Sequence, residues 1–167
     1  VDGTLDSEFF PRVDGDIAAI AVQPDGAILV GGDFSSVWGL GTILSNRSFI
    51  ARFNRDGSLD NAFAPQVNAP VNAFATQADG KIIVGGHFTR ALAPGATTPL
   101  ARNHLARLNG DGSIDTSFEL DAGGRVLASV TQTTMTNASL KPAVRYAGTY
   151  PWLRAASSSG ATRTCGA

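Results

Sequence analysis

The chain repeats two phrases with a nearly fixed period, and this period constrains its fold more than any other feature. One phrase, an Asp-Gly turn followed by an aliphatic residue, Asp and a later Phe, starts at Asp2, Asp56 and Asp111. The other phrase, Asp-Gly with an aliphatic run, Gly-Gly and Phe, occupies 25–34 and recurs 54 residues later at 79–88. A period near 50 with strand-like content indicates a stacked or radial array of one supersecondary unit.

Within each period the hydrophobic pattern predicts three or four short strands. The apolar runs 17–22 and 71–76 each lead through an Asp-Gly turn into branched aliphatic residues, which is a strong hairpin signal. A third strand is expected at 49–53, with its counterpart at 105–108. Twelve Asp against two Glu, together with nineteen glycines, favour tight turns over helices. This content is typical of a propeller blade.

The sequence therefore predicts an all-β chain of propeller-type blades in tandem, with about three units. Residues 1–13 are expected to be the outer-edge end of a preceding repeat, followed by blade 1 at 14–65 and blade 2 at 66–120. A degenerate blade 3 is expected at 121–154 and a flexible tail at 155–167. Closed propellers take about four to eight blades, so we expect further blades in a larger propeller, or completion by oligomerisation.

Composition argues against several classes of function. The net charge is −1, whereas a protein that binds nucleic acid needs a basic surface. No apolar run approaches the roughly 20 residues of a membrane helix, so membrane insertion is not expected. His87 and His104 would serve as an acid–base pair, but no nucleophile or third group accompanies them. We therefore expect a chain that is not an enzyme.

Two motifs resemble a known family. Gln-Pro-Asp-Gly at 23–26 and Ala-Arg-Phe-Asn at 51–54 are near matches to the pattern of the delta-sixty repeat family, bacterial proteins with an expected β-propeller fold. The resemblance covers residues 17–118, whereas 119–167 depart from the pattern. It implies a secreted or cell-surface bacterial protein, and it brings no catalytic residues.

The turns rich in Asn and Asp are candidate metal sites, because oxygen-bearing side chains at alternate positions suit hard cations such as Ca²⁺. Their glycine stands at the fourth position and no Glu closes the loop, unlike a helix-flanked calcium loop. The favoured interpretation is a turn in which Asp accepts backbone hydrogen bonds, with Ca²⁺ as the alternative and no other cofactor expected. The candidate ligands are Asn54, Asp56, Asp60, Asn109, Asp111 and Asp115.

Two arginines, Arg52 and Arg107, recur inside apolar strands. A half-buried guanidinium needs an acceptor, and the carboxylates of the same unit, Asp60 and Asp115, are its expected partners. The role predicted for both arginines is to support the scaffold.

These observations predict a non-enzymatic binding or scaffold module that presents two variable loops, 35–48 and 89–104, to a protein or glycan partner. An alternative is a carbohydrate-binding module that uses loop aromatics, because exposed aromatic rings stack on sugars. The competing use of these aromatics is packing between blades. The candidate contact residues are Trp38, Arg47, Phe49, Arg90 and Trp152.

Overall fold

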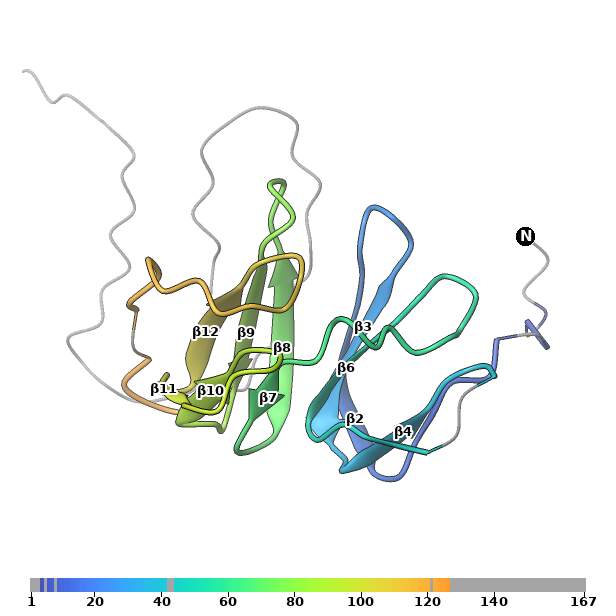
Figure 1. Ribbon diagram of the computed structural model, residues 1–167, viewed down its shortest axis with the longest axis horizontal. Helices are drawn as coiled ribbons and strands as arrows, with labels where there is room; N and C mark the ends of the chain where they lie inside the picture. Colours follow the sequence, from blue (N-terminus) through green and yellow to red (C-terminus); the bar gives the residue numbers. More distant parts are fainter. Residues whose placement is uncertain (1–3, 5, 8, 42–43, 121, 127–167) are drawn as a thin grey trace, which may run out of the picture.

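The computed structural model describes residues 4, 6–7, 9–41, 44–120 and 122–126. These residues form twelve β-strands in four three-stranded antiparallel sheets, and they contain no helix (Figure 1). Among the described residues, no helix has the length and apolar composition needed to cross a membrane. The predicted all-β fold of propeller-type blades is confirmed, with open sheets in place of a closed ring.

Blade 1 contains a large sheet and a small sheet. The large sheet has the strand order β2-β3-β6, and the small sheet has the order β1-β4-β5. Only short segments of chain separate the strands of one sheet from those of the other, so each long strand bends from the large sheet into the small one. The strands are β1 (Arg12–Val13), β2 (Asp16–Val22), β3 (Ile28–Asp33), β4 (Ser36–Trp38), β5 (Ser45–Asn46) and β6 (Ile50–Phe53).

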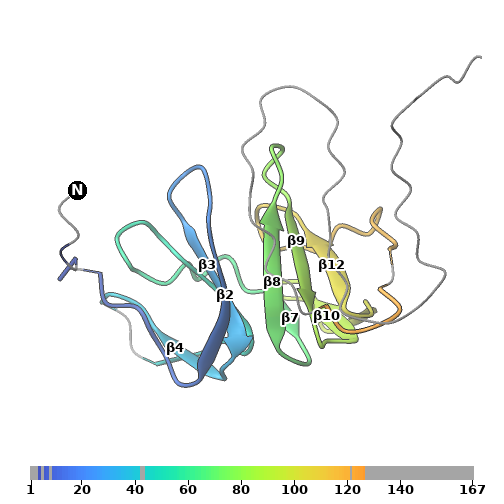
Figure 2. The ribbon, with the colours of Figure 1, turned by 180° about the vertical axis from the view of Figure 1, so that it is seen from behind.

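Blade 2 repeats this plan strand for strand. Its large sheet has the order β8-β9-β12 and its small sheet the order β7-β10-β11. The two large sheets lie side by side, with β2 and β3 against β8, and both small sheets lie at the same end (Figures 1 and 2). The strands are β7 (Gln66–Val67), β8 (Val71–Thr76), β9 (Ile82–Gly86), β10 (Arg90–Leu92), β11 (Leu100–Ala101) and β12 (Leu105–Leu108).

The observed strands differ from the expected ones in several ways, and the expected loops 35–48 and 89–104 each contain two short strands of a small sheet. The third strand of blade 1 begins at Ile50 because Phe49 has a φ of 68°, which an extended strand does not allow. A possible fourth strand of each large sheet is reduced to a single bridge. This bridge joins Phe53 with Leu59 in blade 1 and Leu108 with Ile114 in blade 2.

The structure describes some of the residues at the expected unit boundaries. Arg12–Val13, assigned from the sequence to the preceding repeat, pair with β4 of blade 1. Of the expected blade 3, only residues 122–126 are described, and the expected tail at 155–167 lies outside the described residues.

The largest core cluster lies between the two blades. Blade 1 contributes small and aliphatic side chains from its large sheet, and blade 2 contributes Phe and branched aliphatic side chains. Burial of such surface is the main favourable term in folding. The contact therefore holds the two blades together through side chains that include Ala19, Leu29, Ile50, Val71, Phe74 and Val84.

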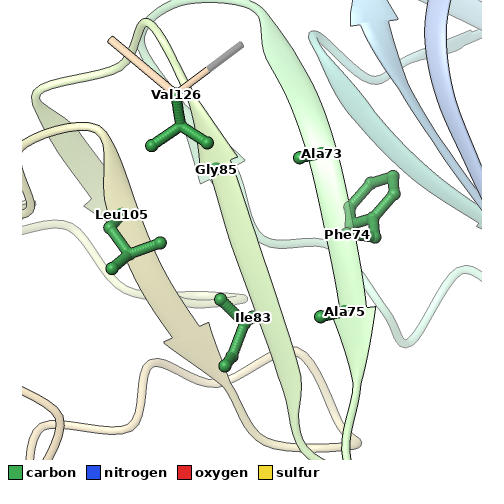
Figure 3. Close-up of a pocket in the computed structure, with 7 residues that line it drawn as sticks. All are labelled: Ala73, Phe74, Ala75, Ile83, Gly85, Leu105 and Val126. Carbon is green, nitrogen blue, oxygen red and sulfur yellow. The ribbon is translucent and has the colours of Figure 1, made fainter. Parts of the chain in front are cut away.

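Glycine makes this contact close. A Cβ atom on Gly31 would lie 2.7 Å from Cγ1 of Val71 and 2.8 Å from the ring of Phe74. The same contact recurs one unit later, where a Cβ on Gly85 would lie 2.6 Å from Cγ1 of Val126 (Figure 3). The central strand of each large sheet, β3 or β9, therefore carries glycine at the point where the next unit packs against it.

We expect Gly31→Ala to destabilise the chain by about 1–3 kcal/mol, because the added methyl group forces the two blades apart. The matched control is Gly123→Ala, where a Cβ would meet no atom within 4 Å. The control is expected to change stability by less than about 0.5 kcal/mol. Urea unfolding of both variants measures the difference, and equal stability of the two would contradict the packing.

Candidate functional site

An arginine network joins the two blades. Arg52 Nε and Nη2 lie 2.8 Å and 2.7 Å from Oδ2 of Asp60, and the guanidinium lies 4.2 Å from the ring centre of Phe63. Arg52 Nη1 also donates to the carbonyl oxygen of Gly110 in blade 2, at 2.6 Å. Burial alone would raise the pKa of Asp60, but the hydrogen bonds from Arg52 and from the Phe63 N–H outweigh it and lower that pKa.

Blade 2 holds the same arrangement with an added cation. Arg107 Nε and Nη2 each lie 2.8 Å from Oδ2 of Asp115, and the guanidinium lies 4.7 Å from the ring centre of Phe118. Lys81 Nζ reaches the same oxygen at 2.8 Å. The hydrogen bonds from Lys81 and from the Ser117 hydroxyl hold the pKa of Asp115 well below its usual range.

Both predicted arginine–aspartate pairs are confirmed. Sequence reasoning missed the stacking of each guanidinium on a Phe ring and the bond of Arg52 to Gly110 across the blades. A signal for the stacking was present, because Arg and Phe recur at the same spacing in both units, as in Arg52 and Phe63. The network binds the parts of the scaffold to one another.

The candidate metal ligands lie in tight turns. In blade 1, Oδ1 of Asp56 accepts both the N–H of Ser58 at 2.9 Å and its hydroxyl at 2.7 Å, and these bonds lower the pKa of Asp56. Asn54 Nδ2 donates to the same hydroxyl at 2.9 Å, while Asp60 faces Arg52. The turns thus use these groups for their own hydrogen bonds.

The corresponding turn of blade 2 has the same hydrogen-bond pattern. Asn109 Nδ2 donates to the hydroxyl of Ser113 at 2.8 Å, and Oδ1 of Asp111 accepts the Ser113 N–H at 2.9 Å. Asp115 lies in the cationic network instead. The described part of the chain holds no group of three or more His, Cys, Asp or Glu side chains placed to bind one metal ion.

The first variable loop is anchored by Asp14, which lies between β1 and β2. Its Oδ1 accepts the backbone N–H groups of Ser35 at 2.8 Å and Ser36 at 2.9 Å, and its Oδ2 accepts the Ser35 hydroxyl at 2.6 Å. The hydroxyl bond is the largest of the effects that lower the pKa of Asp14 to about 2.

Blade 2 uses an amide for the same purpose. Oδ1 of Asn68 accepts the N–H groups of Thr89 and Arg90, both at 2.9 Å, and its Nδ2 donates to the Thr89 hydroxyl at 3.1 Å. The two loops therefore leave their blades from the same hydrogen-bonded bend, although one anchor is ionisable and the other is not.

Two candidate contact residues lie on the small sheets, at the same end of the two blades (Figure 1). Trp38 is half-buried in β4 and pairs with Arg12 of β1. Arg90 is exposed in β10, opposite Ala101. The structure thus brings one aromatic and one cationic candidate to the end of the molecule that carries the small sheets. We call this end the loop end.

The other three candidates have different surroundings. Arg47 follows β5 and is half-buried, and its guanidinium donates to the carbonyl oxygens of Asn46 at 3.3 Å and Asn61 at 3.4 Å. Phe49 packs against the core between the blades. Trp152 lies outside the described residues.

We expect Arg52→Met to destabilise the chain by about 1–3 kcal/mol, because it leaves the half-buried Asp60 without its cation. The matched variant is Arg107→Met, whose carboxylate partner keeps Lys81 as a second cation. Arg107→Met should therefore cost less stability than Arg52→Met. Urea unfolding of both variants tests the order, and a larger loss for Arg107→Met would refute this account.

The two loop anchors should respond differently to acid, because Asp14 is ionisable and Asn68 is not. The folded pKa of Asp14 is about 2, below the ordinary value of 3.8, so its carboxylate stabilises the fold above pH 3.8 and this contribution is lost as pH falls toward 2. Asp14→Asn should remove that loss, whereas Asn68→Asp should add one. Stability measured by urea unfolding between these pH values checks both, and an unchanged slope in Asp14→Asn would speak against the anchor.

A protein-family model described as a domain of unknown function (DUF5122) with a β-propeller fold matches the chain twice, at residues 23–63 and 77–118. Each match runs from the hairpin turn of one blade to the Phe that stacks on its arginine. No curated protein and no solved structure gives a significant match. The repeated strand plan, the repeated arginine network and the paired family match together identify β-propeller repeats in this chain.

Proposed function

We propose that the chain is a non-enzymatic binding or scaffold module of a secreted or cell-surface bacterial protein, with repeats of the delta-sixty type. In this function, the blades are a rigid support and the two variable loops form the contact surface. The observation that supports it is the contrast between the matching frameworks and the differing loops. The large and small sheets agree strand for strand, whereas the loops between their small-sheet strands share no sequence pattern.

The side chains at the loop end suit a protein partner. Within the two loops, Leu40, Leu44 and Leu100 are 46%, 50% and 37% exposed, so both loops offer apolar side chains to a partner. Neither loop, 35–48 or 89–104, contains an acidic residue, and arginine is the charged side chain of both. Apolar side chains mixed with arginine are typical of protein–protein interfaces.

A second candidate function is carbohydrate binding. Trp38 favours it, because the residue is half-buried and stands opposite Arg12 in the β1–β4 pair, which places an aromatic residue and a hydrogen-bond donor on neighbouring strands. A glycan ligand would use Trp38 in place of the exposed leucines. The two functions therefore differ in which residues carry the binding.

We immobilise the chain and select peptides that bind it from a displayed library. These peptides are expected to bind at the loop end. Arg90→Ala and Leu100→Ser should each weaken that binding about tenfold or more, because both side chains are exposed there. The matched control is Asp79→Asn at the opposite end of blade 2, which should bind as the parent chain does. Affinity measured by surface plasmon resonance gives the comparison.

Two results would contradict the proposal. Peptides that bind Arg90→Ala and Leu100→Ser as well as the parent chain would place the contact elsewhere. Binding to a glycan array that is lost in Trp38→Ala, without any peptide binding, would favour the carbohydrate function instead.

A further inference from the structure

The two small sheets share an outward face. Side chains alternate between the two faces of a strand, and Val37 of β4 and Ala91 of β10 are buried in the core. Their neighbours along each strand therefore point away from the core, together with the residues paired to those neighbours. We call the surface formed by these residues the small-sheet surface. It consists of Arg12, Ser36, Trp38 and Asn46 in blade 1 and Gln66, Arg90, Leu92 and Ala101 in blade 2.

The charged residues of the small-sheet surface are both arginines. Arg12 and Arg90 are exposed, and neither lies within ion-pair distance of a carboxylate in the described part of the chain. A guanidinium presents several N–H donors in a planar fork that matches a carboxylate. Both arginines can therefore give these donors to a ligand.

Two further arginines stand beside this surface. Arg47 directly follows β5 and Arg102 directly follows β11, which are edge strands at corresponding places of the two small sheets. Their guanidinium groups donate to main-chain carbonyl oxygens, as Arg102 Nη1 does to Ala101 at 2.8 Å. A carbonyl oxygen is neutral, so the positive charge of both arginines remains. The four arginines together give the loop end a positive potential.

The cations of the framework are neutralised instead. Arg52, Arg107 and Lys81 each lie within 2.8 Å of a carboxylate oxygen. Charge pairing among the described residues is therefore a property of the arginine network, whereas the small sheets carry arginines without a carboxylate.

Acidic residues lie where the large and small sheets of blade 1 meet, and none of them is part of the small-sheet surface. Asp14 accepts three hydrogen bonds from Ser35 and Ser36 at the bend between β1 and β2. Asp16 and Asp33 face each other across β2 and β3, in the large sheet. The corresponding residues of blade 2 are not acidic: Asn68, Pro70 and His87. A ligand on the small-sheet surface therefore meets arginine as its charged neighbour.

Apolar side chains border the arginines. Leu92 follows Arg90 on the same face of β10 and is half-buried. Leu44 directly precedes β5 and Leu100 lies in β11, so both stand at the rim of the small sheets. A ligand that carries charge alone would leave these leucines in water, whereas a segment with acidic and apolar residues contacts both kinds of side chain.

We propose that the small-sheet surface binds an acidic segment of a protein partner. This inference rests on the proposed function, because it names the chemistry of the partner that the loop end binds. The carboxylates of the segment pair with Arg12 and Arg90, and its apolar side chains pack on Leu92 and on the leucines at the rim. Arginine–carboxylate pairs are strong and directional, so they favour an acidic segment over a neutral one.

Fluorescence anisotropy tests the charge of the partner. The probe is a short labelled peptide of Glu, Leu and Ser residues, and the comparison peptide has Gln in place of every Glu. The chain is titrated into each peptide at low salt and at physiological salt. Labelled oligogalacturonate, a glycan that carries carboxylates, is titrated in parallel.

We expect the Glu peptide to bind about tenfold or more tightly than the Gln peptide at low salt, and physiological salt should reduce this difference because it screens exposed charges. Arg12→Gln and Arg90→Gln should each weaken binding of the Glu peptide about threefold or more, with a smaller effect on the Gln peptide. The matched control is Arg55→Gln. Arg55 is exposed and lies against the hairpin turn at Gly26, away from the small sheets, so this variant should bind as the parent chain does.

Three outcomes would overturn the inference. The first is equal affinity for the Glu and Gln peptides, or no binding of either. The second is an equal loss in Arg55→Gln, because net charge rather than the small-sheet surface would then attract the peptide. The third is tighter binding of oligogalacturonate than of the Glu peptide, because the arginines would then serve a glycan. Failure of the proposed function is distinct, since library peptides would then bind Arg90→Ala and Leu100→Ser as well as the parent chain.

Discussion

The packing of the large sheet of blade 1 on the large sheet of blade 2 is the contact on which the rest of the structure depends. Each large sheet has three strands and a single-bridge fourth, so it cannot enclose an apolar core alone. Gly31 lets the two sheets approach until Val71 and Phe74 are sealed from water. The arginine network stands at the edge of this contact and ties both blades through Arg52 and Gly110.

Most of the framework was predictable because it repeats. The regular return of the hairpin turns predicted the blades, and the need of a half-buried cation for an acceptor predicted the pairing of Arg52 with Asp60. Other features depend on contacts between distant segments. The left-handed backbone of Phe49 and the reach of Arg52 to Gly110 leave no local pattern in the sequence. The loop contacts are the least predictable part, since each loop occurs once.

The two blades show how one framework tolerates exchange of its parts. Asp14 and Asn68 hold equivalent bends with a carboxylate and an amide, because the backbone N–H groups that they bind need only an acceptor oxygen. At Asp115, Lys81 joins the arginine and makes the charge balance of blade 2 differ from that of blade 1. Such exchanges leave the hydrogen-bond geometry in place while altering its response to acid and its tolerance of mutation.

The place of Phe63 has a consequence for how such an array can grow. The residue closes the sequence motif of one unit, yet it packs between the arginine of that unit and the turn of the next. Covalent unit and packing unit are therefore out of phase. A tandem duplication or deletion of one whole repeat recreates the same junction wherever in the repeat the gene is cut. The number of units can thus change by unequal recombination while each new junction keeps its Phe, its arginine and its turn glycine.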